Sequence, residues 1–238
     1  QHGYTVNDWL LDGRALAFTF ERFARSRAQF WQRRQELFDV LSPTGGTVTY
    51  RRVLPCGSRR DIQGWVEGLA ANPGEDGLHF PVSFTLKCPD PAWYDPTEQS
   101  FTIQHSNENL TYPITFPITF GIDGIGAETL TNNGSWRTYP IITLTGPFEW
   151  AAIANETTGA LLNIQARHQV GEVTVIDLTP GQQSVTKDGV NAFNSLGDDS
   201  NLGDWYLAPG ANFISVSSRE DDDDSSVVIT YYDRYIAL

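Results

Sequence analysis

The sequence predicts a mainly β protein built from two β-sandwich-type domains, the first of which carries one amphipathic helix. Three observations lead to this prediction. Short segments of alternating polar and apolar residues recur along most of the chain, with Gly, Pro, Asn and Asp turn signals between them. Only one stretch, about residues 21–41, has apolar residues at helical spacing. The charge composition changes near Asp90, which indicates a domain boundary.

The two halves of the chain differ sharply in charge. The chain has 238 residues, 40% of them hydrophobic, and a formal net charge of −13. Residues 1–90 carry 11 Lys/Arg against 10 Asp/Glu, a net +1, whereas residues 91–238 carry 5 against 19, a net −14. We therefore expect domains at residues 1–96 and 97–238. The acidic second half argues against nucleic-acid binding, because neutralising phosphates requires Lys/Arg clusters.

The first domain is predicted to place its helix between strands. Residues 11–20 alternate and favour a strand, and the helix of about residues 21–41 follows. Its apolar stripe consists of Phe23, Phe30, Leu37 and Leu41. Ser42-Pro43 ends it, since the residue before a proline avoids the α region. Further strands are predicted at 45–54, 59–69 and 78–89, and the proline-rich segment 88–96 is predicted to be an extended connector.

Basic and aromatic residues decorate the predicted helix. The set consists of Arg22, Arg25, Arg27, Trp31, Arg33, Arg34 and Phe38. One interpretation is a solvated basic face with Glu21 and Glu36 as local partners. The other is a subunit interface, in which the arginines meet acidic surface and the aromatic residues act as anchors. The sequence alone leaves both interpretations open.

The second domain is predicted to contain only short strands. They are expected at 101–105, 112–120, 139–145, 160–167, 172–178, 183–187, 205–207, 212–218 and 226–234. This spacing is typical of a β-sandwich or jelly roll. Alternation predicts that Ile142 and Leu144, Leu162 and Ile164, and Ile214 and Val216 point inward. Asn133-Gly134 predicts a tight turn with positive φ angles.

No motif of catalysis or metal binding is present. His2, His79, His105 and His168 lack partners at zinc-ligand spacing, and no nucleophile or phosphate-binding motif occurs in a suitable context. We expect no catalytic, metal or cofactor site, and no enzyme. The acidic run 219–224 is interpreted as a hairpin tip rather than a calcium site. Two cysteines make no disulfide framework and favour synthesis in the cytosol, and no apolar run approaches the ~20 residues of a membrane span.

Aromatic residues of the second domain allow another interpretation, a sugar platform. The candidates are Trp136, Tyr139, Trp150, Trp205 and Tyr206. Aromatic residues belong more often to a core or an interface than to a sugar site. The hypothesis of a carbohydrate-binding module or adhesin stays open as the alternative function.

An ordered series of segments resembles the distal tail protein family of long-tailed bacteriophages, the siphovirus-type tail components. The segments are "CPDPAWYDP" (88–96), "YPITFPITFG" (112–121), "TNNGSWRTYPIITLTGP" (131–147), "NETTGALLNI" (155–164), "GEVTVIDLTP" (171–180), "VTKDGVNAFNSL" (185–196) and "YLAPGANFISV" (206–216). The resemblance covers most of residues 80–218. The first ninety residues fit the family's first domain only in outline.

The resemblance implies a structural virion protein without catalysis. The first domain would form a ring, commonly a hexamer, at the distal end of the tail. That ring would join the tail tube protein to the tail tip hub and receptor-binding proteins. DNA and the tape measure protein would pass through its lumen without specific binding. The second domain would be a galectin-like jelly roll that projects as an attachment platform, with no cofactor and no membrane insertion. The protein would be made in the cytoplasm of the host bacterium.

Overall fold

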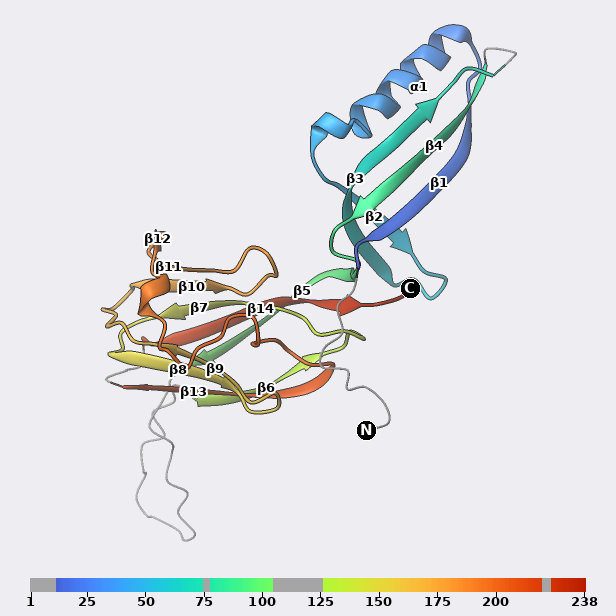
Figure 1. Ribbon diagram of the computed structural model, residues 1–238. Helices are drawn as coiled ribbons and strands as arrows, with labels where there is room; N and C mark the ends of the chain where they lie inside the picture. The colour runs from blue at the N-terminus through green and yellow to red at the C-terminus, as the bar shows by residue number, and fades with distance from the viewer. Residues whose placement is uncertain (1–11, 75–77, 105–125, 220–223) are drawn as a thin grey trace, which may run out of the picture. The chain divides into compact units, whose positions relative to one another are not determined.

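The computed structural model describes residues 12–74, 78–104, 126–219 and 224–238, which divide into two units (Figure 1). Unit 1 comprises residues 1–96 and 236–238, and unit 2 comprises residues 97–235. Strands make up most of both units, and the described residues contain a single α-helix. The mainly β fold class is therefore confirmed. The segment predicted as a proline-rich connector is largely strand, because β5 (Trp93–Gln104) begins there and continues into unit 2.

Unit 1 is built on an antiparallel sheet. Strand β1 (Arg14–Phe23) pairs along its whole length with β4 (His79–Cys88). β4 pairs in turn with β3 (Arg59–Ala71), and β3 pairs with β2 (Val48–Val53). Side chains alternate between the two faces of a strand. One face of β4 is accordingly buried, whereas the other carries exposed residues.

Helix α1 (Arg27–Val40) lies along one side of this sheet (Figure 1) and is followed by the short 3₁₀ helix η1 (Pro43–Gly45). The predicted helix start near residue 21 is wrong, because β1 continues to Phe23 to complete its pairing with β4. The helix begins after Ser26, whose side-chain oxygen accepts a hydrogen bond from the backbone N–H of Gln29 at 3.2 Å. Such an N-cap satisfies a donor that the first turn leaves unpaired.

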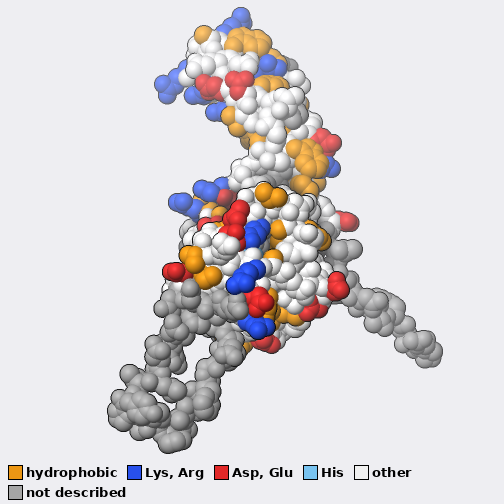
Figure 2. Space-filling model, turned by 90° about the vertical axis from the view of Figure 1, so that its left-hand side faces the viewer, with side chains coloured by type: hydrophobic (Ala, Val, Ile, Leu, Met, Phe, Trp, Pro, Cys, Tyr) orange, Lys and Arg blue, Asp and Glu red, His pale blue; other side chains and the backbone are white. Residues whose placement is uncertain are grey.

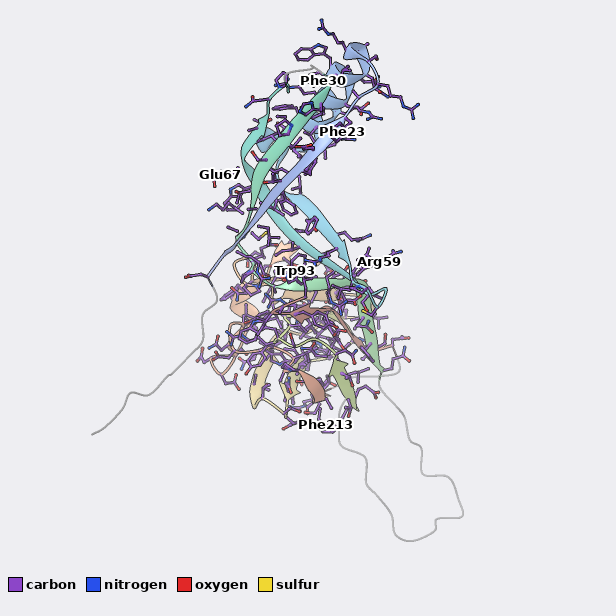
Figure 3. The ribbon with its side chains drawn as sticks, turned by 90° about the vertical axis from the view of Figure 1, so that its right-hand side faces the viewer. Phe23, Phe30, Arg59, Glu67, Trp93 and Phe213 are labelled. Atoms are coloured by element: carbon purple, nitrogen blue, oxygen red, sulfur yellow. The ribbon has the colours of Figure 1, made fainter. Side chains whose placement is uncertain are left out.

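The core of unit 1 lies between α1 and the buried face of the sheet. Phe30 is 2% exposed, and its ring centroid is 5.0 Å from that of Phe80 on β4. Leu37 lies two helical turns further on and joins Val82 in the same cluster. Figure 3 shows Phe30 between α1 and the strands. Two of the four residues of the predicted apolar stripe, Phe30 and Leu37, are therefore the buried residues of the helix.

Unit 2 contains two sheets. The strands are β5, β6 (Gly126–Asn132), β7 (Ile141–Thr145), β8 (Trp150–Asn155), β9 (Ala160–Ile164), β10 (Val173–Asp177), β11 (Ser184–Lys187), β12 (Val190–Asn191), β13 (Gly210–Arg219) and β14 (Ser226–Tyr235), with η2 (Phe193–Ser195) after β12. One sheet has the order β5-β14-β7-β10-β11-β12, and the other has the order β6-β13-β8-β9. Their buried side chains form one hydrophobic cluster, so unit 2 is a β-sandwich.

The predicted inward faces of unit 2 are confirmed. Ile142, Leu144, Leu162, Ile164 and Ile214 are 0% exposed, and Val216 is 3% exposed. The segment 205–207 forms only an isolated bridge through Leu207, and β6, β8 and β12 were not predicted. The predicted strand 112–120 lies outside the described residues.

The corner at Asn133-Gly134 is a bend held by a close approach. Gly134 does not have a positive φ angle, so the predicted reason for this glycine is wrong. A Cβ atom at this position would lie 2.2 Å from the carbonyl oxygen of Arg234. The Asn133 N–H donates to an Asp233 carboxylate oxygen at 3.0 Å, which holds the corner against β14. Glycine is therefore required here for space.

His168 is a buried structural residue of unit 2. Its ring stacks on Phe148 with centroids 4.1 Å apart. Nδ1 lies 2.9 Å from the carbonyl oxygen of Ala166, which can only accept, so Nδ1 carries the proton. Nε2 then accepts a hydrogen bond from the hydroxyl of Thr174 at 2.6 Å. Burial lowers the pKa of His168, against a smaller opposing effect of the Ala166 hydrogen bond.

We predict that Phe30→Ala destabilises unit 1 by about 3–5 kcal/mol, the usual cost of emptying a buried aromatic site. The exposed neighbour Trp31 provides the control, and Trp31→Ala should cost about 0.5 kcal/mol. Urea unfolding followed by the helical circular dichroism signal isolates unit 1, because the only described α-helix lies there. Equal losses in the two variants would contradict the assigned core.

We predict that unit 2 loses stability as the pH falls below 6.5, the ordinary pKa of histidine. The folded state holds His168 with a lowered pKa, so the unfolded state takes up the proton first as the medium becomes acidic. The stability that His168 provides is thus complete above its unfolded pKa and is lost as the pH falls toward the folded pKa. Melting temperatures of the wild type and His168→Asn, measured from about pH 7.5 to about pH 5.5, should show a steeper fall for the wild type. Parallel curves would refute this assignment.

Candidate functional site

The predicted basic face does not lie on one element. Arg22 is in β1, Arg25 is in the turn that precedes the helix, and Arg27 is the first helical residue. Arg25 and Arg27 are exposed. The N–H of Arg25 donates to Oε1 of Gln29 at 2.7 Å, while the N–H of Gln29 binds Ser26, so both ends of the turn are fixed. The two exposed arginines therefore extend from an ordered backbone.

Arg33 and Arg34 have a different position, because both bind the backbone of unit 1. Nη1 of Arg33 donates to the carbonyl oxygen of Phe23 at the end of β1. Nε of Arg34 donates to the carbonyl oxygen of Ala71 at the end of β3, over 3.0 Å. Hydrogen bonds from charged donors are stronger than neutral ones. These two arginines therefore tie α1 to the ends of the sheet.

Arg34 also organises two aromatic residues of the candidate interface. Its guanidinium lies 4.6 Å from the ring centroid of Phe38 and 5.6 Å from that of Trp31. Phe38 is half-buried and packs on the core of unit 1, whereas Trp31 is 57% exposed. The rings of Trp31 and Phe30 meet edge to face, with centroids 5.2 Å apart. The exposed Trp31 is therefore held in place by the buried Phe30 beneath it.

Sequence reasoning missed other exposed apolar residues of unit 1. Phe23, assigned to the buried stripe of the helix, ends β1 instead and is 63% exposed, with its ring 5.9 Å from that of His79. Trp65 on β3 is 45% exposed. The register places Phe23 and Trp65 on the face of the sheet away from the core. The alternation of residue types from residue 14 to residue 23 could have indicated that the strand extends to Phe23. Figure 2 shows apolar and basic side chains together on the surface of unit 1.

The predicted sugar platform is not an open aromatic surface. Trp205 is 0% exposed and its indole N–H donates to the carbonyl oxygen of Ile153 at 3.2 Å, so Trp205 belongs to the core of unit 2. The half-buried Trp136, Tyr139 and Tyr206 surround Arg137, whose guanidinium lies 5.5–6.0 Å from the three ring centroids. The guanidinium of Arg137 therefore occupies the space beside these rings in which a sugar would have to stack.

The remaining candidate residues form neither a metal cluster nor a disulfide within the described part of the chain. No group of three His, Cys, Asp or Glu residues there could hold a metal ion. Cys56 is exposed, Cys88 is buried, and both are free thiols. Helix α1 falls short of the length and apolarity that a membrane-spanning helix needs. His2, His105 and most of the acidic run 219–224 lie outside the described residues.

Two hollows of unit 2 lie near the β8-β9 edge. The first has a volume of about 510 Å³ and is lined mainly by polar residues of β11, β12 and η2, including Asn191, Asn194 and Lys187. The second has a volume of about 450 Å³ and is lined by Glu149, Trp150, Asn163 and Gln165. Gln165 lines both. Sequence reasoning named Trp150 in this region but missed the amide side chains around it.

The fold resembles that of a solved phage protein. The Dit protein of phage SPP1, described as a paradigm of the hub adsorption apparatus in phages that infect Gram-positive bacteria, aligns over 98% of this chain and 84% of its own. The TM-score is 0.63 and the sequence identity 15%, so the likeness is one of fold. A chain of the phage P2 baseplate in its activated conformation with Ca aligns over 91% of this chain and 78% of its own, with 12% identity and a TM-score of 0.46. No curated protein sequence matches significantly.

The family match falls on unit 2. Residues 133–235 match the model of the siphovirus-type tail component, C-terminal domain. This range contains β7 to β14 and therefore most of the sandwich. Residues 133–235 therefore match the C-terminal domain of the siphovirus-type tail components, and the fold of the chain resembles that of the SPP1 Dit protein.

Proposed function

We propose that this chain forms the ring at the distal end of a siphovirus-type tail, in the virion. The ring, a hexamer, connects the tail tube protein to the tail tip hub and the receptor-binding proteins. DNA and the tape measure protein pass through its lumen without specific binding. The protein is made in the cytoplasm of the host and acts structurally, without catalysis. The observation that carries this proposal is the family match of residues 133–235, together with a fold likeness that spans 98% of the chain.

Unit 1 supplies the surface for self-association in this proposal. Among its described residues a helix covers one face of the sheet only, and the opposite face exposes Phe23 and Trp65. Exposed Trp31 adds a third large apolar side chain. Aromatic residues and arginine are the residue types enriched in the centres of protein interfaces. Unit 2, with a complete core of its own, serves as the attachment platform.

The arginines then divide into two classes. Arg33 and Arg34 hold unit 1 together, whereas Arg25 and Arg27 remain for a neighbouring subunit. The charge of the chain supports such a pairing, since residues 91–238 carry a net −14. Each exposed ion pair contributes only ~0–1 kcal/mol, but a repeated interface multiplies the contribution and sets register.

We predict that the purified chain assembles into a ring with six times the chain mass of 26.5 kDa. Light scattering gives the mass, and negative-stain microscopy of the same sample shows whether a central lumen is present. A monomer at every concentration would reject the ring, and an open filament would reject closed symmetry.

We predict that the double variant Arg25→Glu, Arg27→Glu weakens assembly and leaves the subunit folded. Charge reversal turns an attraction into a repulsion, and the effect should shrink as salt shortens the screening length to below ~8 Å. Sedimentation at low and high salt measures assembly, and circular dichroism checks the fold. The matched control, Arg25→Lys with Arg27→Lys, keeps the charge and should assemble normally. Unchanged assembly of the reversed variant at low salt would show that these arginines are only solvated.

A further inference from the structure

We propose that the two hollows beside β8 and β9 form one binding groove for a neutral glycan. This inference goes beyond the tail ring, because it assigns a ligand to unit 2. It keeps only Trp150 of the five aromatic residues in the platform predicted from the sequence, because Arg137 covers three of the other rings and the core contains the fourth.

The hollows are neighbours that share one lining side chain. Gln165 lines both, and their volumes of about 510 and 450 Å³ each fall within the range of ligand sites. Together they extend from Trp150 and Glu149, past Asn163 and Gln165, to the β12-η2 region. A groove of this form suits an extended chain of small rings better than a single compact ligand.

The lining has the chemistry of polyol recognition. Asn163, Gln165 and Asn194 each present a planar amide with two donors and an acceptor, which matches neighbouring hydroxyl groups of a sugar. Asn191 adds its NH₂ group, because its Oδ1 already accepts the N–H of Phe193 at 3.0 Å. Trp150 adds a large aromatic side chain. Aromatic rings pack well on the apolar C–H faces of sugar rings, while their edges and the amides bind the polar groups.

The charges at the groove favour a neutral ligand. Glu149 pairs with Arg219, with Oε2 and Nε 3.2 Å apart, and Lys187 pairs with Glu172 at 2.7 Å. The Asp188 carboxylate accepts the N–H of Val173 at 3.0 Å. The described charged groups of the lining thus already have partners within unit 2. A phosphate-rich polymer finds no excess of positive charge there, because the lining holds Glu149 and Asp188 against Lys187.

The backbone around the groove is fixed before any ligand arrives. Asn163 accepts the N–H of Gly197 on its carbonyl oxygen at 2.8 Å and donates its own N–H to the hydroxyl of Ser200 at 2.8 Å. Gln165 donates its N–H to the carbonyl oxygen of Ser195 at 2.7 Å. These bonds join the end of β9 to the loop after η2. A prebuilt groove lowers the conformational cost of binding.

Saturation-transfer NMR with neutral hexasaccharides of glucose, galactose and N-acetylglucosamine tests the proposal, since the method works on a monomer and on a large ring. We expect transfer to at least one hexasaccharide, with a Kd of about 1 mM or tighter. Trp150→Ala and Gln165→Ala should each weaken binding about tenfold. Gln165 is exposed, so its variant remains informative if Trp150→Ala fails to fold. Because binding is measured independently of assembly, a negative result here leaves the ring proposal intact.

Phe213→Ala is the matched control and should bind like the wild type. Phe213 is 48% exposed on strand β13 of the same sheet, where the register pairs Arg219 with Trp150. Six residues separate Phe213 from Arg219, about 20 Å along the strand. Figure 3 shows Phe213 at the outside of unit 2. Absence of transfer to all three hexasaccharides, wild-type binding by both groove variants, or tighter binding of poly(glycerol phosphate) would overturn the proposal.

Discussion

Helix α1 covers only part of one face of the sheet in unit 1, and this incomplete cover determines how large a core the unit can form. Its 14 residues span about 21 Å, whereas the ten residues of β4 span about 33 Å. Phe30 and Leu37 close the end of the sheet near Phe80, and Tyr50 packs against Trp93 further along, with ring centroids 6.0 Å apart. The opposite face has no such layer among the described residues of unit 1. A small core and an open face are the conditions under which association adds most to stability.

The sequence predicted the fold where the hydrophobic pattern was strong. Ile142 and Leu144 alternate with threonines, and that alternation determines the buried face of β7. β8 was missed because "WAAIAN" holds three alanines, which have low strand propensity, and its position between β13 and β9 overrides that preference. The helix start was placed too early because Phe23 fits both the helical spacing of apolar residues and the alternation of a strand. Only the pairing of β1 with β4 decides between them.

The candidate site was predictable in residue type but not in role. A run of arginines indicates charge, yet nothing local distinguishes Arg27, which points to solvent, from Arg33 and Arg34, which bind carbonyl groups of β1 and β3. The same limit applies to aromatic residues. Trp205 sits between turn residues, and only the tertiary structure places its indole against Ile153. Contacts between residues far apart in the chain decide these roles, and no short sequence window contains them.

The two units differ in how closely their surface side chains are tied to the fold. In unit 2 the sandwich buries a cluster drawn from both sheets, and buried polar residues such as Asn155 and Asn212 bind loop backbone, so its surface features rest on a complete core. Surface side chains of unit 2 can therefore vary with little effect on folding. In unit 1 the same groups that hold the helix, above all Arg34, also position the exposed Trp31. Changes there alter the fold and the exposed surface together, so unit 1 has less freedom to vary than unit 2.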